Sequence, residues 1–321
     1  MNGKTNGWSG SVRAQDSNLT SSVRPQAIGN THPAAEPISV APRPQAMDDP
    51  IISLRDVTKS FGRHTVLSDI TFDVPRNKIT AILGPSGTGK SVLLKTILGL
   101  LRPEQGQIFV DGEPIVGIRT KELYRIRAKF GVLFQDGALF GSLNLYDNIA
   151  FPLREHTHKS EHEIRQRVLA NAEMVGLLDH LQKLPGEVSG GMRKRAGLAR
   201  AMVMEPEIVL FDEPDSGLDP VRVAYLDELV LTAQRETNAT FFVITHNISS
   251  TMRIADYMGV LFRSNLVRFA SKTDMTSDTN PIIRQFLAGK SEGPIGMDEM
   301  ADSDETTSER SFASMSPVTT N

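Results

Sequence analysis

The residues best suited to chemistry lie in one glycine-rich run that ends in a lysine and a serine. The run consists of Gly84, Pro85, Ser86, Gly87, Thr88, Gly89, Lys90 and Ser91. It fits the pattern Gly, four residues, Gly-Lys-Ser, in which backbone N–H groups and the start of a helix surround phosphate oxygens. Lys90 would then place its charge on the β- and γ-phosphates, and the Ser91 hydroxyl would bind Mg²⁺. The pattern predicts an ATP site; the alternative is a connecting turn that carries a lysine.

A second candidate feature is a pair of acids, Asp212 and Glu213, which follow the unbroken apolar run 208–211. A buried parallel strand that ends in two acids presents them at the carboxyl edge of its sheet, where ligands of open α/β sheets bind. There Asp212 would hold Mg²⁺, and Glu213 would be the general base toward the attacking water. Strand ends often carry acids for structural reasons alone. Together with the glycine-rich run, the pair predicts hydrolysis of ATP.

Strands and helices alternate around these residues. The predicted strands are 79–83, 208–211 and 241–245, and the predicted helices are 91–101, 161–175 and 221–233. Such alternation predicts the α/β class, with a mostly parallel sheet covered on both faces. Residues 51–74 alternate polar and apolar residues and break at Asp69 and Pro75. We therefore expect a small antiparallel sheet beside the main one.

Composition excludes several other classes of protein. The chain has 321 residues, no cysteine and a net charge of −3. It therefore has no disulfide and no thiolate metal site, and its charge does not favour a nucleic-acid partner. No apolar run approaches the roughly 18 to 20 residues that span a bilayer, and the first residues lack the basic, apolar and small-residue pattern expected of a secretory signal. We expect a soluble, cytoplasmic protein that reaches a membrane only through a partner.

The two ends of the chain differ from its centre. Residues 1–50 are polar and rich in Ser, Asn, Pro and Gln, which predicts disorder. Residues 291–321 contain seven acidic residues and one arginine. This tail is interpreted either as a disordered, solubilising end or as a segment that binds a partner. Residues 51–290 are predicted to form one domain.

Residues 188–192, Val-Ser-Gly-Gly-Met, resemble the signature of the ABC ATPases, usually written Leu-Ser-Gly-Gly-Gln. Ser189, Gly190 and Gly191 match it, and Met192 stands in place of the glutamine. A Ser-Gly-Gly turn that begins a helix is a second anion site. The resemblance implies that it acts on the ATP of a second copy. The basic helix that follows, 193–202, would by itself more often be a solvated surface.

The same resemblance implies roles for further positions. Gln135 matches the Q-loop glutamine, which touches Mg²⁺ or the attacking water, and His246 matches the switch histidine at the γ-phosphate. Phe61 matches the aromatic that stacks on adenine, and Val92 completes the ATP-binding set. The D-loop match comprises Ser216, Gly217, Leu218 and Asp219. Without the resemblance, His246 would be interpreted as a surface residue and Phe61 as a core aromatic.

For the fold, the resemblance implies an ABC nucleotide-binding domain. Such a domain has a RecA-like, mostly parallel sheet, a small antiparallel β subdomain, and a helical subdomain, here about 136–205, that carries the signature. Two copies would close head to tail around two ATP molecules with Mg²⁺. Glu213, His246, Gln135 and Lys90 would then be catalytic, and Ser91, Gln135 and Asp212 would bind the metal.

Longer runs narrow the resemblance to the Mce-associated ATPases of actinobacteria (the MceG or Mkl group), relatives of the Mla phospholipid-transport ATPase. The similar runs are 130–144, 146–148, 151–157, 190–200, 212–220 and 293–297. The resemblance implies uptake of lipids or sterols across the cell envelope, with integral permease subunits and Mce-type envelope proteins as partners. The chain would then be peripheral on the inner face of the plasma membrane. The alternatives are a lipid or lipoprotein exporter and a non-transport ATPase with a macromolecular partner.

An apolar stretch follows Gln135. It contains Ala138, Leu139, Phe140, Leu143 and Leu145. A soluble monomer would not readily expose so many apolar side chains in a loop. We expect this stretch to form part of the groove that receives a cytoplasmic helix of a permease. The alternative is that these residues close the core of the helical subdomain.

Overall fold

The computed structural model describes residues 46–135 and 137–296. Most of the predicted N-terminal segment and acidic tail therefore lies outside the described residues. Within the described ranges, no helix combines the length and hydrophobicity that a bilayer span requires.

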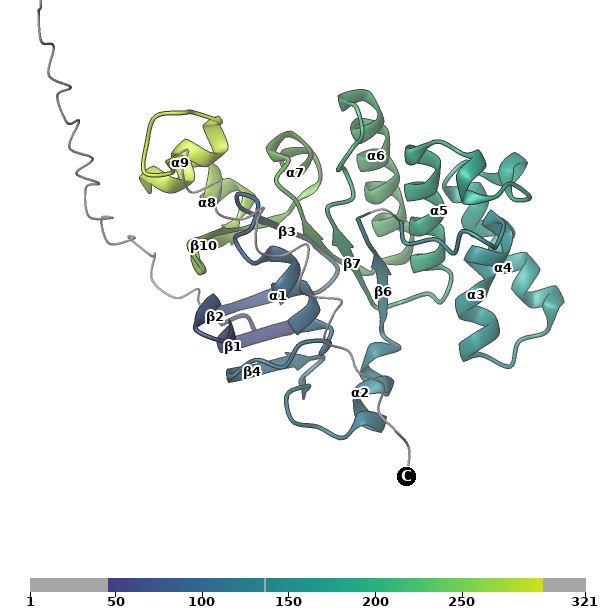
Figure 1. Cartoon of the computed structure of the whole chain (residues 1–321), viewed down its shortest axis with the longest axis horizontal. Helices are drawn as coiled ribbons and strands as arrows, with labels where there is room; N and C mark the ends of the chain where they lie inside the picture. The colour runs from purple at the N-terminus through teal and green to yellow at the C-terminus, as the bar shows by residue number, and fades with distance from the viewer. Residues whose placement is uncertain (1–45, 136, 297–321) are drawn as a thin grey trace, which may run out of the picture. The chain divides into compact units, whose positions relative to one another are not determined.

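The main sheet has six strands in the order β10-β9-β3-β8-β7-β6 (Figure 1). The strands are β3 (Ile79–Leu83), β6 (Phe130–Leu133), β7 (Ile208–Asp212), β8 (Thr240–Ile244), β9 (Tyr257–Phe262) and β10 (Asn265–Ser271). All neighbours pair in parallel except β9 and β10. Every residue of β3, β7 and β8 is buried, which explains their unbroken apolar sequences. The predicted mostly parallel sheet is confirmed.

The order of the strands brings distant parts of the sequence together. Ile82 of β3 pairs with Ile244 of β8, and Ile244 pairs with Asp212 of β7. These three strands therefore end at the same level. The segments that follow them, together with the segment after β6, leave the sheet along a single carboxyl edge.

A second sheet is antiparallel, with the order β2-β1-β4-β5. Its strands are β1 (Pro50–Phe61), β2 (His64–Pro75), β4 (Gln105–Val110) and β5 (Glu113–Pro114). The predicted small antiparallel sheet is confirmed, but the predicted break at Asp69 is wrong because β2 continues through that residue. Asp69 has a φ of 52° and its N–H donates to the Thr58 hydroxyl at 3.1 Å. It is thus an irregular position within a strand.

Nine α-helices lie within the two described ranges. They are α1 (Lys90–Ile97), α2 (Thr120–Arg127), α3 (Leu145–His156), α4 (Glu161–Met174), α5 (Gly190–Met202), α6 (Pro220–Thr237), α7 (Ile248–Ile254), α8 (Lys272–Thr276) and α9 (Pro281–Ala288), with 3-10 turns at Leu178–His180 and Pro185–Glu187. The first helix ends earlier than predicted because Gly99 adopts a φ of 65°, the left-handed conformation that terminates helices.

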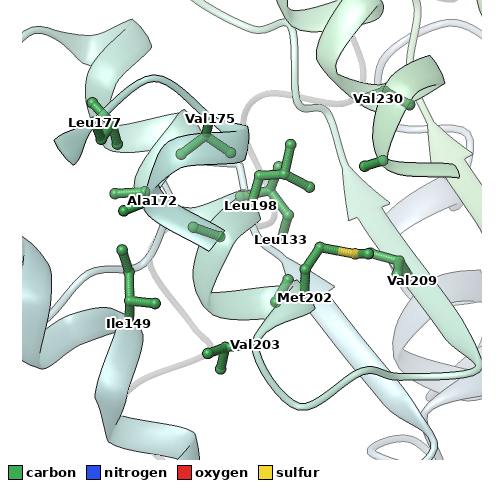
Figure 2. Close-up of a cluster of buried hydrophobic side chains, with 14 of the residues drawn as sticks. Leu133, Ile149, Ala172, Val175, Leu177, Leu198, Met202, Val203, Val209 and Val230 are labelled. Atoms are coloured by element: carbon green, nitrogen blue, oxygen red, sulfur yellow. The ribbon is translucent and has the colours of Figure 1, made fainter. Parts of the chain in front are cut away.

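Helices α3, α4 and α5 pack against one another, and α5 also packs on β6. Figure 2 shows Ile149, Ala172 and Leu198 of these helices in one apolar cluster with Val209 of β7. The helices that follow the Gln135 loop therefore share a core with the sheet.

Near the C-terminal end of the described residues, Ile295 is buried. Its N–H donates to the Gln285 side-chain oxygen at 2.7 Å, and its carbonyl accepts from the Gln285 side-chain nitrogen at 3.0 Å. Packing thus continues beyond residue 290, the predicted boundary of the domain.

Candidate functional site

The glycine-rich run joins β3 to α1 and passes very close to its neighbours. A Cβ at Gly84 would clash with the Leu261 carbonyl at the end of β9. Gly89 has a φ of 94°, and a Cβ there would lie 2.8 Å from the Val66 carbonyl oxygen in β2. Glycine is thus required at both positions, and the run has the strand-loop-helix context that its pattern predicts.

Lys90, the first residue of α1, points back into the loop. Its Nζ donates to the carbonyl oxygens of Gly84 and Pro85, both at 2.8 Å, and the residue is buried. Burial lowers the pKa of Lys90, and the nearby carboxylates of Glu213 and Asp212 oppose this shift. A cation is therefore held among backbone dipoles, where its charged form is disfavoured until an anion approaches.

The next residue connects the loop to the second candidate feature. The Ser91 hydroxyl donates to Asp212 Oδ1 at 3.0 Å across 121 positions of sequence. Burial raises the pKa of the Asp212 carboxyl, the bond from Ser91 opposes this, and Glu213 adds to it. A hydroxyl and a carboxylate are oxygen ligands of the kind that Mg²⁺ prefers. Within the described residues, no three His, Cys, Asp or Glu side chains form a metal cluster, so Mg²⁺ here would depend on phosphate and water oxygens as well.

Glu213 and His246 meet at the same edge. The Glu213 backbone has a φ of 47°, and its N–H donates to the Ile244 carbonyl at 2.8 Å. Its Oε1 lies 3.5 Å from His246 Nδ1, and the two side chains are 18% and 51% exposed. Both groups are thus placed beside Asp212 with access to solvent, as a residue acting on bound water requires.

Gln135 follows a strand of the main sheet, and Phe61 ends a strand of the antiparallel sheet. Gln135 is exposed and follows β6, whose Leu133 pairs with Phe211, so it lies at the same edge as Asp212. Phe61 ends β1 and is 49% exposed, with Lys59 Nζ 4.9 Å from its ring centre. The ring is therefore available for stacking rather than buried in the core. Val92, by contrast, packs its side chain against a hydrophobic core.

The signature lies beside the D-loop. Ser189 begins α5, and its hydroxyl accepts a bond from the Met192 N–H at 3.3 Å. Ser189, Gly191 and Met192 line a depression of about 240 Å³ together with Leu218 and the start of α6. At that start, Val221 is 78% exposed. The two predicted motifs thus come together on one surface, which carries exposed apolar side chains.

The D-loop itself is held at several points. Its last residue, Asp219, caps α6 and accepts bonds from the N–H groups of Val221 and Arg222 at 3.1 and 3.0 Å. Asp215, the residue before the D-loop, accepts a hydrogen bond from the Thr245 hydroxyl at 2.8 Å. This buried bond joins the D-loop to the turn that carries His246. Sequence reasoning missed Asp215 and Thr245, although each adjoins a predicted site residue.

The basic helix is not a solvated surface. Lys194 is 5% exposed, and its Nζ donates to the Ser216 hydroxyl at 3.1 Å and also to the Ser216 carbonyl. Arg193 and Arg195 donate to the carbonyls of Val188 and Val175, at 2.9 and 2.8 Å. Sequence reasoning missed these contacts. The one sequence signal for these contacts is that Lys194 lies between two arginines, just before the small residues of the helix.

The apolar stretch after Gln135 divides into two parts. Leu145 is fully buried and Leu139 packs on the core, so the core interpretation holds for them. Phe140 remains 44% exposed and lies 4.7 Å, centre to centre, from the Phe151 ring. The buried Asn148 side chain holds this loop. Its Oδ1 accepts from the Phe140 N–H at 2.8 Å, and its Nδ2 donates to three loop carbonyls within 3.1 Å. The exposed aromatic surface is therefore fixed in place.

Known proteins share this organisation. The model of the family described as ABC transporter matches residues 67–216. The chain is 55% identical to the probable ribonucleotide transport ATP-binding protein mkl of Mycobacterium leprae (strain TN), over 78% of this chain and 72% of that one. It is 39% identical to the intermembrane phospholipid transport system ATP-binding protein MlaF of Escherichia coli (strain K12), over 76% of this chain and 91% of MlaF.

A solved structure gives the same result. The dimeric post-hydrolysis state of the ATP-binding cassette MJ0796, bound to ADP and Pi, matches with a TM-score of 0.63 and 28% identity, over 68% of this chain and 98% of that one. The predicted α/β fold with its two sheets and its helices is therefore confirmed as the fold of such cassettes. The chain belongs to the ABC transporter ATP-binding proteins and is the ATPase subunit of such a transporter.

Proposed function

We propose that ATP is bound and hydrolysed at the carboxyl edge of the main sheet. The observation that carries this proposal is the bond from Ser91 to Asp212, which unites the phosphate loop with the acidic strand end. Lys90 and the loop N–H groups would bind the β- and γ-phosphates, and Phe61 would stack on adenine. Bound Mg²⁺, held by Ser91, Asp212 and Gln135, would neutralise charge on the phosphates.

The chemical step is assigned to Glu213. Its carboxylate accepts a proton from a water molecule while the water oxygen attacks the γ-phosphorus. The bond from the γ-phosphorus to the bridging oxygen breaks, and ADP and phosphate leave. His246, 3.5 Å from Glu213, would contact the γ-phosphate and hold the base in position.

We also propose that two copies share each ATP. Within one chain the signature lies beside the D-loop and α6, and exposed Val221 and Tyr225 adjoin it. A second copy would cover this surface in a two-fold arrangement, with the signature of one chain on the ATP of the other. The dimeric MJ0796 cassette bound to ADP and Pi supports this arrangement.

The transported substrate is proposed to be a lipid or sterol, taken up across the envelope with Mce-type proteins. The names of the two relatives differ, because one specifies ribonucleotides and the other phospholipids. The similarity of residues 130–144, 190–200 and 212–220 to the Mce-associated and Mla ATPases supports the lipid substrate. We place the chain on the inner face of the plasma membrane, bound to integral permease subunits.

Phe140 and Phe151 form the proposed docking site for a cytoplasmic helix of the permease. Phe140 is exposed and Phe151 is half-buried beside it, and both adjoin the Gln135 loop, so a partner bound there would touch the segment that leads to the ATP site. Phe140→Asp should abolish co-purification with the permease, because a charge would be buried at the contact. Tyr124→Asp is the matched control, since Tyr124 is 64% exposed on α2. Equal recovery of the permease with both variants would contradict the docking site.

The function is tested by isolating tagged Glu213→Gln protein from native membranes in detergent with ATP and Mg²⁺. Mass spectrometry of the bound chains and lipids should find a polytopic permease, Mce-type envelope proteins and lipid. A permease that carries ribonucleotides and no lipid would contradict the proposed substrate. Recovery of ribosomal or nucleic-acid proteins, with no membrane protein, would contradict the proposed coupling to transport.

A further inference from the structure

One arginine connects the signature helix to the loop that follows Gln135. Arg200, in the last turn of α5, directs both terminal nitrogens at this loop. Its Nη2 donates to the Gly137 carbonyl at 2.8 Å, and its Nη1 donates to the Ala138 carbonyl at 2.9 Å. The planar guanidinium thus holds two consecutive carbonyls, two and three residues after Gln135.

The backbones of the same two segments also approach closely. A Cβ at Gly197 of α5 would lie 2.6 Å from Leu133 Cδ1 and 3.1 Å from Gly137 Cα. A Cβ at Gly137 would lie 3.0 Å from the Arg193 carbonyl oxygen. The loop therefore lies directly on the helix, and the arginine bonds it there. This contact is independent of the Arg200 side chain and supports the same geometry.

Burying a guanidinium group at this contact is unfavourable in free energy, which indicates that the contact does more than cover the loop. Burial lowers the pKa of Arg200, because the guanidinium loses water and receives only carbonyl dipoles from the two bonds described. Loops that leave a strand are ordinarily among the more mobile segments of a protein. The two charge-assisted bonds restrain the loop at Gly137 and Ala138.

We propose that Arg200 is a positioning residue for Gln135, which keeps this side chain at its place toward the bound Mg²⁺ and makes the loop move together with the signature helix. The inference rests on the proposed function, because the role of Gln135 is taken from it. A shift of Gln135 by about 1 Å lowers the rate of a reaction that depends on it by up to about 100-fold.

Arg127 provides a matched control. Its Nε and Nη2 donate to the carbonyls of Leu98 and Gly99, both at 2.9 Å, at the end of α1. It is the same kind of contact, an arginine on two consecutive carbonyls, but it lies away from Gln135. Substitution of either arginine by methionine removes two bonds and a charge, so a purely structural role predicts similar losses for both.

The experiment measures kcat and KM for ATP in the full-length chain, with each substitution made in the wild type and in Gln135→Ala. Arg200→Met should lower kcat about tenfold and leave KM within about twofold, and it should have no further effect in the Gln135→Ala background. Arg127→Met should leave kcat unchanged in both backgrounds. Arg200→Lys, which can bond one of the carbonyls, should recover part of the rate.

Two results would overturn the inference in distinguishable ways. If Arg200→Met lowers kcat by the same factor with and without Gln135, Arg200 does not act through Gln135, and the proposed ATP site stands. If Gln135→Ala itself leaves kcat unchanged, the role of Gln135 in the proposed function is wrong, and the inference fails with it.

Discussion

Each edge of the main sheet has a lysine and an aspartate, and their pKa values shift in opposite directions at the two edges. At the carboxyl edge, burial lowers the pKa of Lys90 and raises that of Asp212. Near the amino edge, the bond between Lys129 and Asp111 raises the pKa of the lysine and lowers that of the aspartate. The charged forms are thus disfavoured at one edge and favoured at the other.

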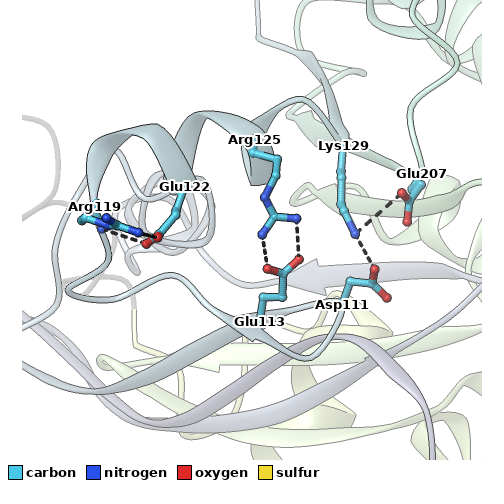
Figure 3. Close-up of polar contacts among 7 residues, drawn as sticks. All are labelled: Asp111, Glu113, Arg119, Glu122, Arg125, Lys129 and Glu207. Atoms are coloured by element: carbon cyan, nitrogen blue, oxygen red, sulfur yellow. Dashed lines mark hydrogen bonds and ion pairs between the residues drawn. The ribbon is translucent and has the colours of Figure 1, made fainter.

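Figure 3 shows the ion pairs near the amino edge. Lys129, just before β6, bonds Asp111 and lies 3.8 Å from Glu207, which precedes β7. Asp111 also bonds Arg76, which leads from β2 toward β3. These pairs join the antiparallel sheet to the starts of three parallel strands. Here the charges neutralise one another, so the network serves the structure.

The difference indicates where a charged ligand is needed. At the carboxyl edge Lys90 donates to carbonyls and Asp212 accepts from a hydroxyl, and neither forms an ion pair with another residue that the structure describes. ATP and Mg²⁺ would supply the missing negative and positive charges. Groups whose charged forms are disfavoured in this way mark functional sites. The comparison therefore predicts loss of activity from changes at one edge and loss of stability from changes at the other.

The largest effect is expected from Lys90→Ala. Loss of the buried cation should weaken ATP binding by about 100-fold or more, because a preorganised charge on the phosphates is removed. The measurement is the Kd for ATP by calorimetry with Mg²⁺ present. Lys129→Met is the control at the opposite edge and should bind ATP normally. Unchanged affinity in Lys90→Ala would contradict the assignment of the loop.

A smaller effect is expected from Ser91→Ala. Loss of one oxygen ligand should raise the Mg²⁺ concentration needed for half-maximal hydrolysis about tenfold, whereas Ser91→Thr retains the hydroxyl and should change it little. The measurement is the hydrolysis rate as a function of Mg²⁺ at saturating ATP. Identical Mg²⁺ dependence in wild type and Ser91→Ala would remove Ser91 from the metal site.

The smallest effect on activity, and a change in stability instead, is expected from Asp111→Asn. The substitution should lower the free energy of unfolding by about 1 kcal/mol and leave kcat unchanged. The lowered pKa of Asp111 means that its contribution is present above the ordinary value of 3.8 and is lost as the pH falls through the lowered value. The stability difference from wild type in urea should therefore shrink in that acidic range. A clearly lower kcat in Asp111→Asn would contradict the comparison.

Much of the site could be predicted because its signals are local. The glycine-rich run before Lys90 predicts a loop that follows a strand and precedes a helix. The apolar run before Asp212 predicts a buried strand that ends in acidic residues. Parallel strands bring such ends to one edge, so the meeting of Ser91 with Asp212 follows from the motifs. The end of α1 was misplaced because the helical pattern continues through Leu100 and Leu101, whereas the conformation of Gly99 stops the helix.

Other features depend on contacts that no short stretch of sequence specifies. Lys194 and Arg200 lie in a run that suggests a solvated surface, and only the packing of α5 on the loop and strand beside it turns them toward carbonyls. Strand β6 contains Gly131, at which a Cβ would clash with the Ala201 carbonyl. A glycine weakens the signal for a strand, yet here the close approach of α5 requires it. The ion pairs of Asp111 are equally non-local.

The most direct test of the proposed site is the behaviour of Glu213→Gln with ATP and Mg²⁺. We predict ATP binding, hydrolysis slowed by at least about 100-fold, and a particle of twice the 35.2 kDa chain mass by light scattering. This result requires that Glu213 is the base and that two copies enclose the nucleotide. Hydrolysis at the wild-type rate, or an ATP-bound species of single-chain mass, would contradict it.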